Sequence, residues 1–370
     1  MADVNHSMHQ QISYEAALQS LVLLKNEKAL PIKEGTNVAV VGPHSISRSQ
    51  LFSDYAAGSH CFDGTDACVP TLAEGIAAAN QGGSVSAAMG VEINSNKTDG
   101  IAAALDLVRK SDVVVLALGD DKTIETEGHD RVDTALPGLQ ESFAKQVLGL
   151  EKPTVLVLVS GGPMAIDGIL TYQGKKEGSA GFAIIQAFFP SHKGAQALGQ
   201  TRFGKENRWG KLPITMYPHH YISEQAMTNY DMSASPGRTY KYYQGKPLFP
   251  FGFGLSLTSF NFNCSKAGEE KPTEYTFQCE LHNTGNLDGE EVVQVYHSAV
   301  DIGKVDHPLP KRALRDFKRV AVRAGQKATV AFTLSSKQLE LVNKAGSQTL
   351  YPGVHAIILS RGYASWRQSS

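Results

Sequence analysis

Seven charged side chains crowd one stretch of 13 residues, 119–131, which reads GDDKTIETEGHDR. Glu125 and Glu127 lie two positions apart in it, and Arg131 closes it. A carboxyl group can act as a general acid when burial or a second carboxylate raises its pKa. Hydrolysis of a glycoside commonly uses two such groups, about 5–5.5 Å apart when the anomeric configuration is retained. The stretch could supply one of them, but its composition is also typical of a solvated loop.

Other catalytic and cofactor motifs are missing or weak. The turn at 161–163, Gly-Gly-Pro, follows an apolar strand, but the sequence has neither GxGxxG nor GxxxxGK[ST], and the proline lacks the amide that a phosphate would need. No GxSxG elbow supports a Ser-His-Asp hydrolase. The 12 histidines are scattered, and His192, His219 and His220 lack the spacing of metal ligands. We therefore expect no cofactor and no metal.

Apolar runs of strand length alternate with helical patterns over the first part of the chain. Strands are expected at 37–42, 113–118, 154–163 and 181–189, and helices at 12–24, at 100–112 and from Pro137 onward. Such continuous runs predict a largely parallel sheet covered by helices on both faces, an α/β/α sandwich. In these sheets ligands meet the loops beyond the carboxyl ends of the strands. The charged stretch follows strand 113–118 directly and is expected at that edge.

The sequence pattern changes from about residue 215. A segment rich in Tyr, Pro and Gly comes first and predicts an ordered connection held by aromatic packing. Short alternating runs separated by turn signals follow it, and they favour a small antiparallel β-sandwich. The expected division is an N-terminal helix and lead-in (1–35), the α/β sandwich (36–218), the connection (219–258) and a fibronectin type III-like domain (259–370).

The charge balance limits the classes of partner. The formal net charge is −1, which gives no electrostatic reason to expect nucleic acid or an anionic membrane as a partner. No apolar run approaches the roughly 20 residues that a membrane span needs. The N-terminus has no basic region followed by an apolar stretch, so we expect no signal peptide there. The chain is then intracellular, or a mature or partial piece of something larger.

Cysteines and sequons bear on the compartment. Four cysteines fall into two close pairs, Cys61 with Cys68 and Cys264 with Cys279, without CxxC spacing. They are either buried thiols or two local disulfides formed in an oxidising compartment. Glycosylation sequons begin at Asn5, Asn96 and Asn263. Together these features favour a secreted or lumenal glycoprotein.

Several ordered strings resemble the C-terminal part of family 3 glycoside hydrolases, the β-glucosidase and β-xylosidase family. The most specific is PGRTYKYYQGKPLFPFGFGLSLTSF. NVAVVGPHS is similar to the first strand and turn of the family's second domain, and the charged stretch to its Glu-x-Glu-Gly-x-Asp-Arg motif. NTGNLDGEEVVQVY and LPKRALRDFKRV resemble the fibronectin type III-like module of many members. The spacing inclines towards the β-xylosidase side.

The resemblance implies roles for particular residues. Glu125 is the best match to the family's general acid/base, and Glu127 is the second choice. Asp130 and Arg131 would orient the loop. The family's nucleophile is an Asp on a preceding β/α barrel, which has no counterpart in this chain, so this chain alone is expected to be inactive. One loop turn also departs from the family: FFPSHKGAQ stands where the family has Tyr-Pro-Gly-x-x-Gly-Gly.

Two functions follow as hypotheses. The first is part of a retaining β-glycosidase that acts on terminal β-linked glucose or xylose, with the barrel supplied by another chain or a longer precursor. The second is a non-catalytic carbohydrate-binding or scaffold protein built from the same domains. Both imply an uncovered apolar surface where a barrel would dock, and therefore a protein partner or self-association.

Overall fold

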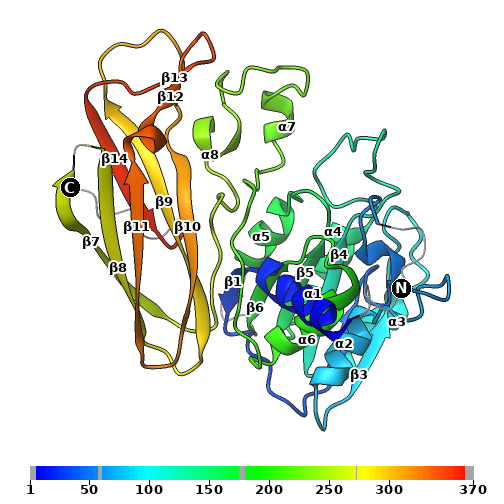
Figure 1. Cartoon of the computed structure of the whole chain (residues 1–370). Coiled ribbons are helices and arrows are strands. Elements are labelled where there is room, and N and C mark those ends of the chain that lie inside the picture. The colour runs from blue at the N-terminus through cyan, green and yellow to red at the C-terminus, as the bar shows by residue number, and fades with distance from the viewer. Residues whose placement is uncertain (1–5, 57–60, 175–179, 272, 363–370) are drawn as a thin grey trace. The chain divides into compact units, whose positions relative to one another are not determined.

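The computed structural model of the chain describes residues 6–56, 61–174, 180–271 and 273–362. They fall into two compact units, coloured along the chain in Figure 1. The first unit runs to Gly210 and includes Met216–His219, and the second takes Lys211–Thr215 and the chain from His220 onward. The exact domain boundaries expected from the sequence stay predictions.

A single sheet organises the first unit. Its described strands are β1 (Val22–Glu27), β2 (Val38–Val41), β3 (Val85–Ala88), β4 (Val113–Gly119), β5 (Thr154–Val159) and β6 (Phe182–Gln186). They lie in the order β1-β6-β5-β4-β2-β3. Strands β2 to β6 pair in parallel, and β1 pairs antiparallel with β6 at the edge. The predicted α/β fold with a mostly parallel sheet is confirmed.

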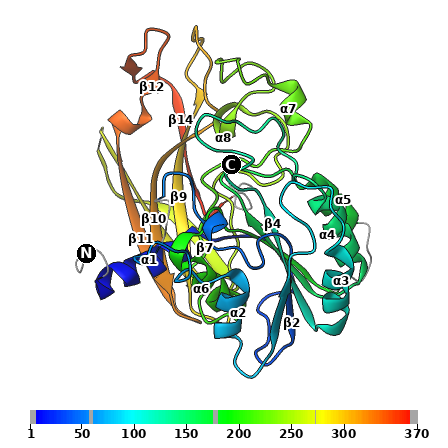
Figure 2. The same cartoon turned by 90° about the vertical axis from the view of Figure 1, so that its right-hand side faces the viewer.

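Helices cover both faces of this sheet. They are α1 (Ser7–Ser20), α2 (Leu72–Ala79), α3 (Ile101–Lys110), α4 (Gln140–Gly149), α5 (Asp167–Gly174) and α6 (Ser191–Arg202). In Figure 2, α1, α2 and α6 lie on one side of the sheet and α3, α4 and α5 on the other. Every residue of β2, β5 and β6 is buried, which explains why these strands are apolar except at Thr154 and Gln186, each at a strand end. No helix in the described ranges is long and apolar enough to cross a bilayer.

The helix expected over residues 12–24 was predicted wrongly at its end. Helix α1 stops at Ser20, and residues 22–24 belong to strand β1. Leu21, Val22, Leu23 and Leu24 are each at most 2% exposed. Four consecutive buried apolar residues do not fit a helix with one apolar stripe, whereas the edge strand against β6 buries them all.

The loop that departs from the family motif has an unusual backbone. Ser191, the first residue of α6, has φ +59°, and Phe188 has φ +53°. A side chain at positive φ brings its Cβ close to the following carbonyl, which costs roughly 1–2 kcal/mol for residues other than glycine. Glycine in the family motif avoids this cost, and Ser191 does not.

Replacing Ser191 with Gly is therefore expected to stabilise the first unit. Removing the Cβ relieves the positive-φ cost, less the extra backbone entropy of glycine in the unfolded chain, for a net gain of about 1 kcal/mol. Urea unfolding of Ser191→Gly and of Ser191→Ala measures the effect. The alanine variant keeps the Cβ, so a comparable gain in it would contradict this explanation.

The second unit is an antiparallel β-sandwich, and a connecting segment precedes it in the sequence. The segment contains α7 (Tyr221–Glu224) and α8 (Thr239–Tyr242). The strands are β7 (Phe260–Lys271), β8 (Glu274–Asn283), β9 (Gly289–Asp301), β10 (Ala313–Val322), β11 (Lys327–Ser335), β12 (Leu341–Val342), β13 (Gln348–Thr349) and β14 (Val354–Ser360). Two three-stranded sheets, β10-β9-β14 and β11-β8-β7, face each other (Figure 1). This matches the sandwich expected from the alternating runs.

One apolar core joins the two sheets of the sandwich. It includes Cys279 and Phe332 from one sheet and Val293 and Val295 from the other. Cys264 on β7 is the register partner of Cys279 on β8, and the two are joined by a disulfide. The structure thus presents this pair as a cross-strand bond next to the core.

Candidate functional site

The carboxyl end of β4 turns sharply at Gly119. Its N–H donates to Gln140 Oε1 at 2.8 Å, and its carbonyl oxygen accepts from Gln140 Nε2 at 2.7 Å. Gly119 has φ +149°, and a Cβ there would lie 1.7 Å from the Val159 carbonyl oxygen. Only glycine fits this approach to β5. The turn directs the next residue, Asp120, into the protein.

Asp120 is a buried carboxylate, only 1% exposed. Its Oδ1 accepts the backbone N–H of Gly161 at 3.2 Å, and its Oδ2 lies 3.5 Å from Arg131 Nη1. Burial raises the pKa of the Asp120 carboxyl to about 6, against the opposing effects of Arg131 and the Gly161 N–H. The nearby carboxylate of Glu125 adds to the rise.

Arg131 joins this buried carboxylate to the charged loop. Its Nε lies 3.1 Å from Glu125 Oε2, and its side chain is 11% exposed. A Cβ at Gly162 would lie 2.5 Å from Arg131 Nη2. The Gly-rich turn after β5 therefore leaves room for the guanidinium, a use that the sequence motif did not suggest. Asp120, Arg131 and Glu125 form one charged cluster.

Glu127 lies at the exposed tip of the same loop. Thr126 and His129 pair through two backbone hydrogen bonds of 3.0 Å, and Glu127 lies between them. The Glu127 N–H donates to Asp54 Oδ2 at 2.6 Å, and Thr126 Oγ1 donates to the same oxygen at 2.7 Å. The two glutamates of the loop therefore have different surroundings: Glu125 faces a guanidinium, and Glu127 is exposed.

The residues expected from the sequence are only partly brought together. Arg131 contacts Glu125 as a loop-orienting role would require, whereas Asp130 is exposed and does not join the cluster. Sequence reasoning missed Asp120 and Asp54. Asp120 was identifiable as the first polar residue after a buried strand. Asp54 gave no local signal, because its contact is with a loop 72 residues away.

A cavity of about 630 Å³ lies beside this loop. It is lined by the residues after three strands: Gln50 after β2, Asn94 after β3, and Asp121 and Thr123 after β4. In the sheet, β2 lies between β4 and β3, so the connections from β2 and β4 diverge there. Ligands of open α/β sheets bind at such switch points. The many polar side chains of the lining suit a ligand with several hydroxyl groups.

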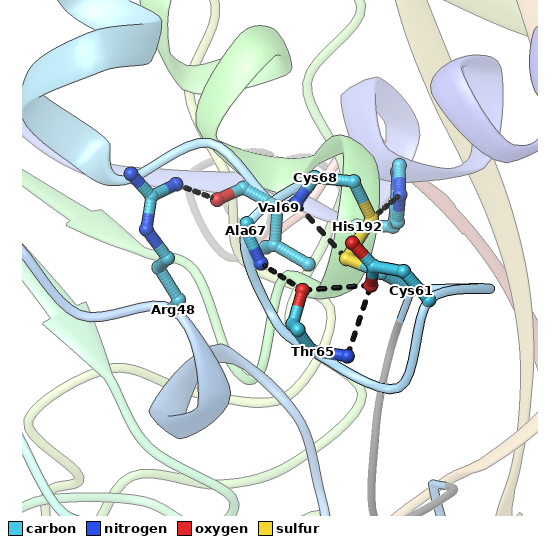
Figure 3. The surroundings of a disulfide bond; sticks show 8 residues. Arg48, Cys61, Thr65, Ala67, Cys68, Val69 and His192 are labelled. Carbon is cyan, nitrogen blue, oxygen red and sulfur yellow. Dashed lines mark hydrogen bonds between the residues drawn. A yellow bond between two sulfur atoms is a disulfide. The ribbon is translucent and has the colours of Figure 1, made fainter.

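The long loop after β2 is fastened at several points. Figure 3 shows the disulfide between Cys61 and Cys68, with His192 Nε2 at 3.5 Å from Cys68 Sγ. Arg48 donates to the carbonyl oxygen of Val69 and forms an ion pair of 2.6 Å with Glu74. The loop that carries Asp54 is thus attached to α2 and closed on itself.

The structure describes two of the three glycosylation candidates. Asn96 and Asn263 are exposed, as an acceptor asparagine must be. Asn5 lies outside the described residues. Three His, Cys, Asp or Glu side chains placed to hold a metal ion are found nowhere in the described ranges.

The raised pKa of Asp120 leads to a prediction for stability. Its folded-state pKa of about 6 exceeds the ordinary 3.8, so between these values the folded protein binds more protons than the unfolded chain. Stability contributed by this group is present below pH 4 and is lost as pH rises through 6. Asp120→Asn keeps an oxygen for the Gly161 N–H but does not ionise. Relative to the wild type, it should gain about 2 kcal/mol between pH 4 and pH 7.

Urea unfolding at pH 4.5 and pH 7 measures this difference. Asp121→Asn is the matched control, because Asp121 is the neighbouring carboxylate and is less buried. The same relative gain in both variants would contradict the assignment to Asp120.

The α/β unit with carboxylates in the loop after β4 and the β-sandwich that follows it occur in the order that the resemblance to family 3 glycoside hydrolases implied. The model of the glycosyl hydrolase family 3 C-terminal domain matches residues 21–257. The model of the fibronectin type III-like domain matches residues 291–361. Since the first match covers more than half of the chain, the chain belongs to glycosyl hydrolase family 3.

Relatives agree with this membership. The chain is 32% identical to the exo-1,4-beta-xylosidase bxlB of Emericella nidulans, over 96% of this chain and 47% of the relative. It is also 32% identical to the "Probable exo-1,4-beta-xylosidase bxlB" of Aspergillus terreus, over 96% of this chain and 46% of the relative. The chain therefore spans about half the length of the curated relatives that it matches.

Solved structures share the fold. The GH3 exo-beta-xylosidase XlnD, in complex with a xylobiose aziridine probe, superposes with a TM-score of 0.81 at 26% identity, over 95% of this chain and 47% of that one. A beta-glucosidase from Listeria innocua gives the same TM-score at 23% identity, over 98% of this chain and 49% of that one. At 23% identity, the match to the Listeria innocua enzyme shows a shared fold only.

Proposed function

We propose that this chain supplies the acid/base half of a retaining β-glycosidase of the β-xylosidase type. The observation that carries the proposal is the loop after β4, which presents two carboxylates at the strand ends beside a polar cavity. One carboxyl group protonates the departing glycosidic oxygen and later takes a proton from the attacking water. The second carboxyl group of the reaction, the nucleophile, comes from a barrel outside these residues.

Of the two loop glutamates, the geometry favours Glu127 as the acid/base, the reverse of the ranking from the sequence. Glu125 has one oxygen 3.1 Å from the guanidinium of Arg131, so its charge is engaged in holding the loop. Glu127 is exposed at the tip, and it is fixed through its backbone N–H rather than through its carboxylate. A general acid needs its carboxyl oxygen within reach of the substrate.

A barrel-bearing partner is part of the proposal. Apolar side chains stand exposed on the loops after β2 and β4: Tyr55 is 80% exposed and Val132 is 96% exposed. Exposed apolar side chains of this size suit a protein interface. The disulfides and the exposed sequons at Asn96 and Asn263 suit an oxidising, extracellular or lumenal site of action.

The experiment that tests this function uses a chimera. The half of the Emericella nidulans relative that this chain does not match is joined ahead of the chain, and hydrolysis of xylobiose is measured for the chimera and for the chain alone. We expect turnover by the chimera and none by the chain alone. Turnover by the chain alone would contradict the proposal, because a double displacement needs a nucleophile from elsewhere. A folded but inactive chimera would contradict it too.

The cavity beside the loop favours a second candidate, a non-catalytic carbohydrate-binding protein. Its lining belongs to this chain, so a sugar can be bound without the barrel. Calorimetry with xylobiose and the chain alone measures this binding. Binding together with an inactive chimera would favour the second candidate over the first.

A further inference from the structure

We propose that Asp54 is the positioning residue that holds the acid/base glutamate in place. The inference rests on the proposed function and names a residue outside the charged loop. Asp54 Oδ2 accepts two hydrogen bonds, from the Glu127 N–H at 2.6 Å and from Thr126 Oγ1 at 2.7 Å. Both donors belong to the tip of the loop after β4, whereas Asp54 belongs to the loop after β2.

Few other hydrogen bonds between described residues hold the tip in place. Its own bonds are the two backbone contacts between Thr126 and His129, which close a tight turn but do not attach it to the rest of the unit. Arg131 holds the loop lower down, at Glu125. The bonds to Asp54 therefore connect the turn that carries Glu127 to another part of the protein.

Asp54 is itself on a well-anchored segment. Phe52 and Leu51, two and three residues before it, are at most 7% exposed. Backbone bonds from Leu51 N–H to Arg48 O and from Phe52 N–H to Ser49 O form the short 3-10 helix there. Arg48 is in turn tied to Val69 and Glu74, as Figure 3 shows for Val69. The segment that carries the Asp54 carboxylate is therefore held in place, as a positioning residue requires.

Hydrogen bonds to the ionised carboxylate hold the pKa of Asp54 below its usual value, with the Glu127 N–H as the largest cause. Asp54 is therefore a charged acceptor at neutral pH, and charged acceptors make the stronger hydrogen bonds. Loss of this acceptor would let the turn move while the buried core of the unit stays intact. A displacement of about 1 Å at a catalytic group can lower a rate about 100-fold.

The test compares Asp54→Ala with a matched control, Asp63→Ala. Asp63 lies nearby on the same loop and also accepts a threonine hydroxyl and a backbone N–H, both from Thr65. Among the described residues, no hydrogen bond joins Asp63 to the loop after β4. The first readout is amide hydrogen exchange in the chain. We expect faster exchange at Glu127 in Asp54→Ala and unchanged exchange there in Asp63→Ala.

The second readout is dependence on the leaving group, measured in the chimera. A substrate with a poor leaving group needs the acid, whereas an activated aryl glycoside departs without a proton. Asp54→Ala should lower kcat/KM for xylobiose about 100-fold and leave kcat/KM for dinitrophenyl β-xyloside unchanged. Asp54→Asn, which keeps an oxygen acceptor, should recover most of the loss. A merely structural defect would lower both substrates together.

Three results would overturn the proposal: unchanged exchange at Glu127, equal losses for both substrates, or the same loss in Asp63→Ala. Failure of the proposed function is distinguishable from these. If Glu127→Gln hydrolyses xylobiose at the wild-type rate, Glu127 is not the acid. Asp54 then has no positioning role in catalysis, even if the exchange data show that it holds the turn.

Discussion

Replacement of Glu127 by Gln in the chimera is expected to lower turnover of xylobiose about 10²–10⁴-fold, the usual contribution of a positioned general acid. Glutamine keeps the shape of the side chain and the backbone N–H that donates to Asp54, but its amide has no acidic proton to transfer. The fold should therefore be intact and the chemistry lost. Hydrolysis of xylobiose with purified variants, at equal folded concentration, measures the effect.

Glu125→Gln is the matched comparison. It removes the ion pair with Arg131 and leaves Glu127 in place, so the loss should be smaller, about tenfold or less. A larger loss in Glu125→Gln than in Glu127→Gln would return the acid/base role to Glu125, the first choice from the sequence. Full activity in both variants would remove the loop from catalysis.

Replacement of Arg202 by Met is expected to stabilise the first unit by about 3 kcal/mol. Arg202 ends helix α6 and is 0% exposed. Among the described residues, none of its three side-chain nitrogens has a hydrogen-bond partner. A buried cation without a partner is costly, and methionine fills a similar volume without that cost.

The stability gain expected for Arg202→Met depends on pH. Burial lowers the pKa of the Arg202 guanidinium from its ordinary value to about 9. Between these values the unfolded chain binds more protons than the folded protein, so wild-type stability rises with pH there. The advantage of Arg202→Met should be full below pH 9 and smaller at pH 10. Arg202→Lys keeps the charge and should bring no such gain. Urea unfolding at both pH values measures it, and a destabilised methionine variant would contradict the argument.

Much of the fold was predictable because a strand buried on both faces appears in the sequence as a continuous run of apolar residues. The runs VAVV, VVVLAL and VLVLV are apolar at every position, and they lie in β2, β4 and β5 in the middle of the sheet. The end of α1 was not predictable from periodicity. Leu21 continues the helical spacing of Ala17 and Leu18, so periodicity marks no end to the helix there, whereas residues 22–24 are apolar at every position and form strand β1 beside β6.

The candidate site was predictable only where its residues are neighbours in the sequence. The loop after β4 carries its carboxylates at the end of a buried strand, which is a local feature. The connection from Asp54 to Glu127 is not local, and the charge of Arg131 gave no sign of which glutamate it holds. Such pairings are set by tertiary contacts between loops, which a single sequence does not encode at any fixed spacing.

Chemical rescue tests most directly whether Glu127 is the acid/base. The Glu127→Ala chimera is incubated with dinitrophenyl β-xyloside, with and without sodium azide. Azide is an anionic nucleophile that needs no general base, so it should attack the glycosyl–enzyme intermediate, speed turnover and release xylosyl azide with the β configuration. No azide product from Glu127→Ala, with rescue of Glu125→Ala instead, would contradict the assignment.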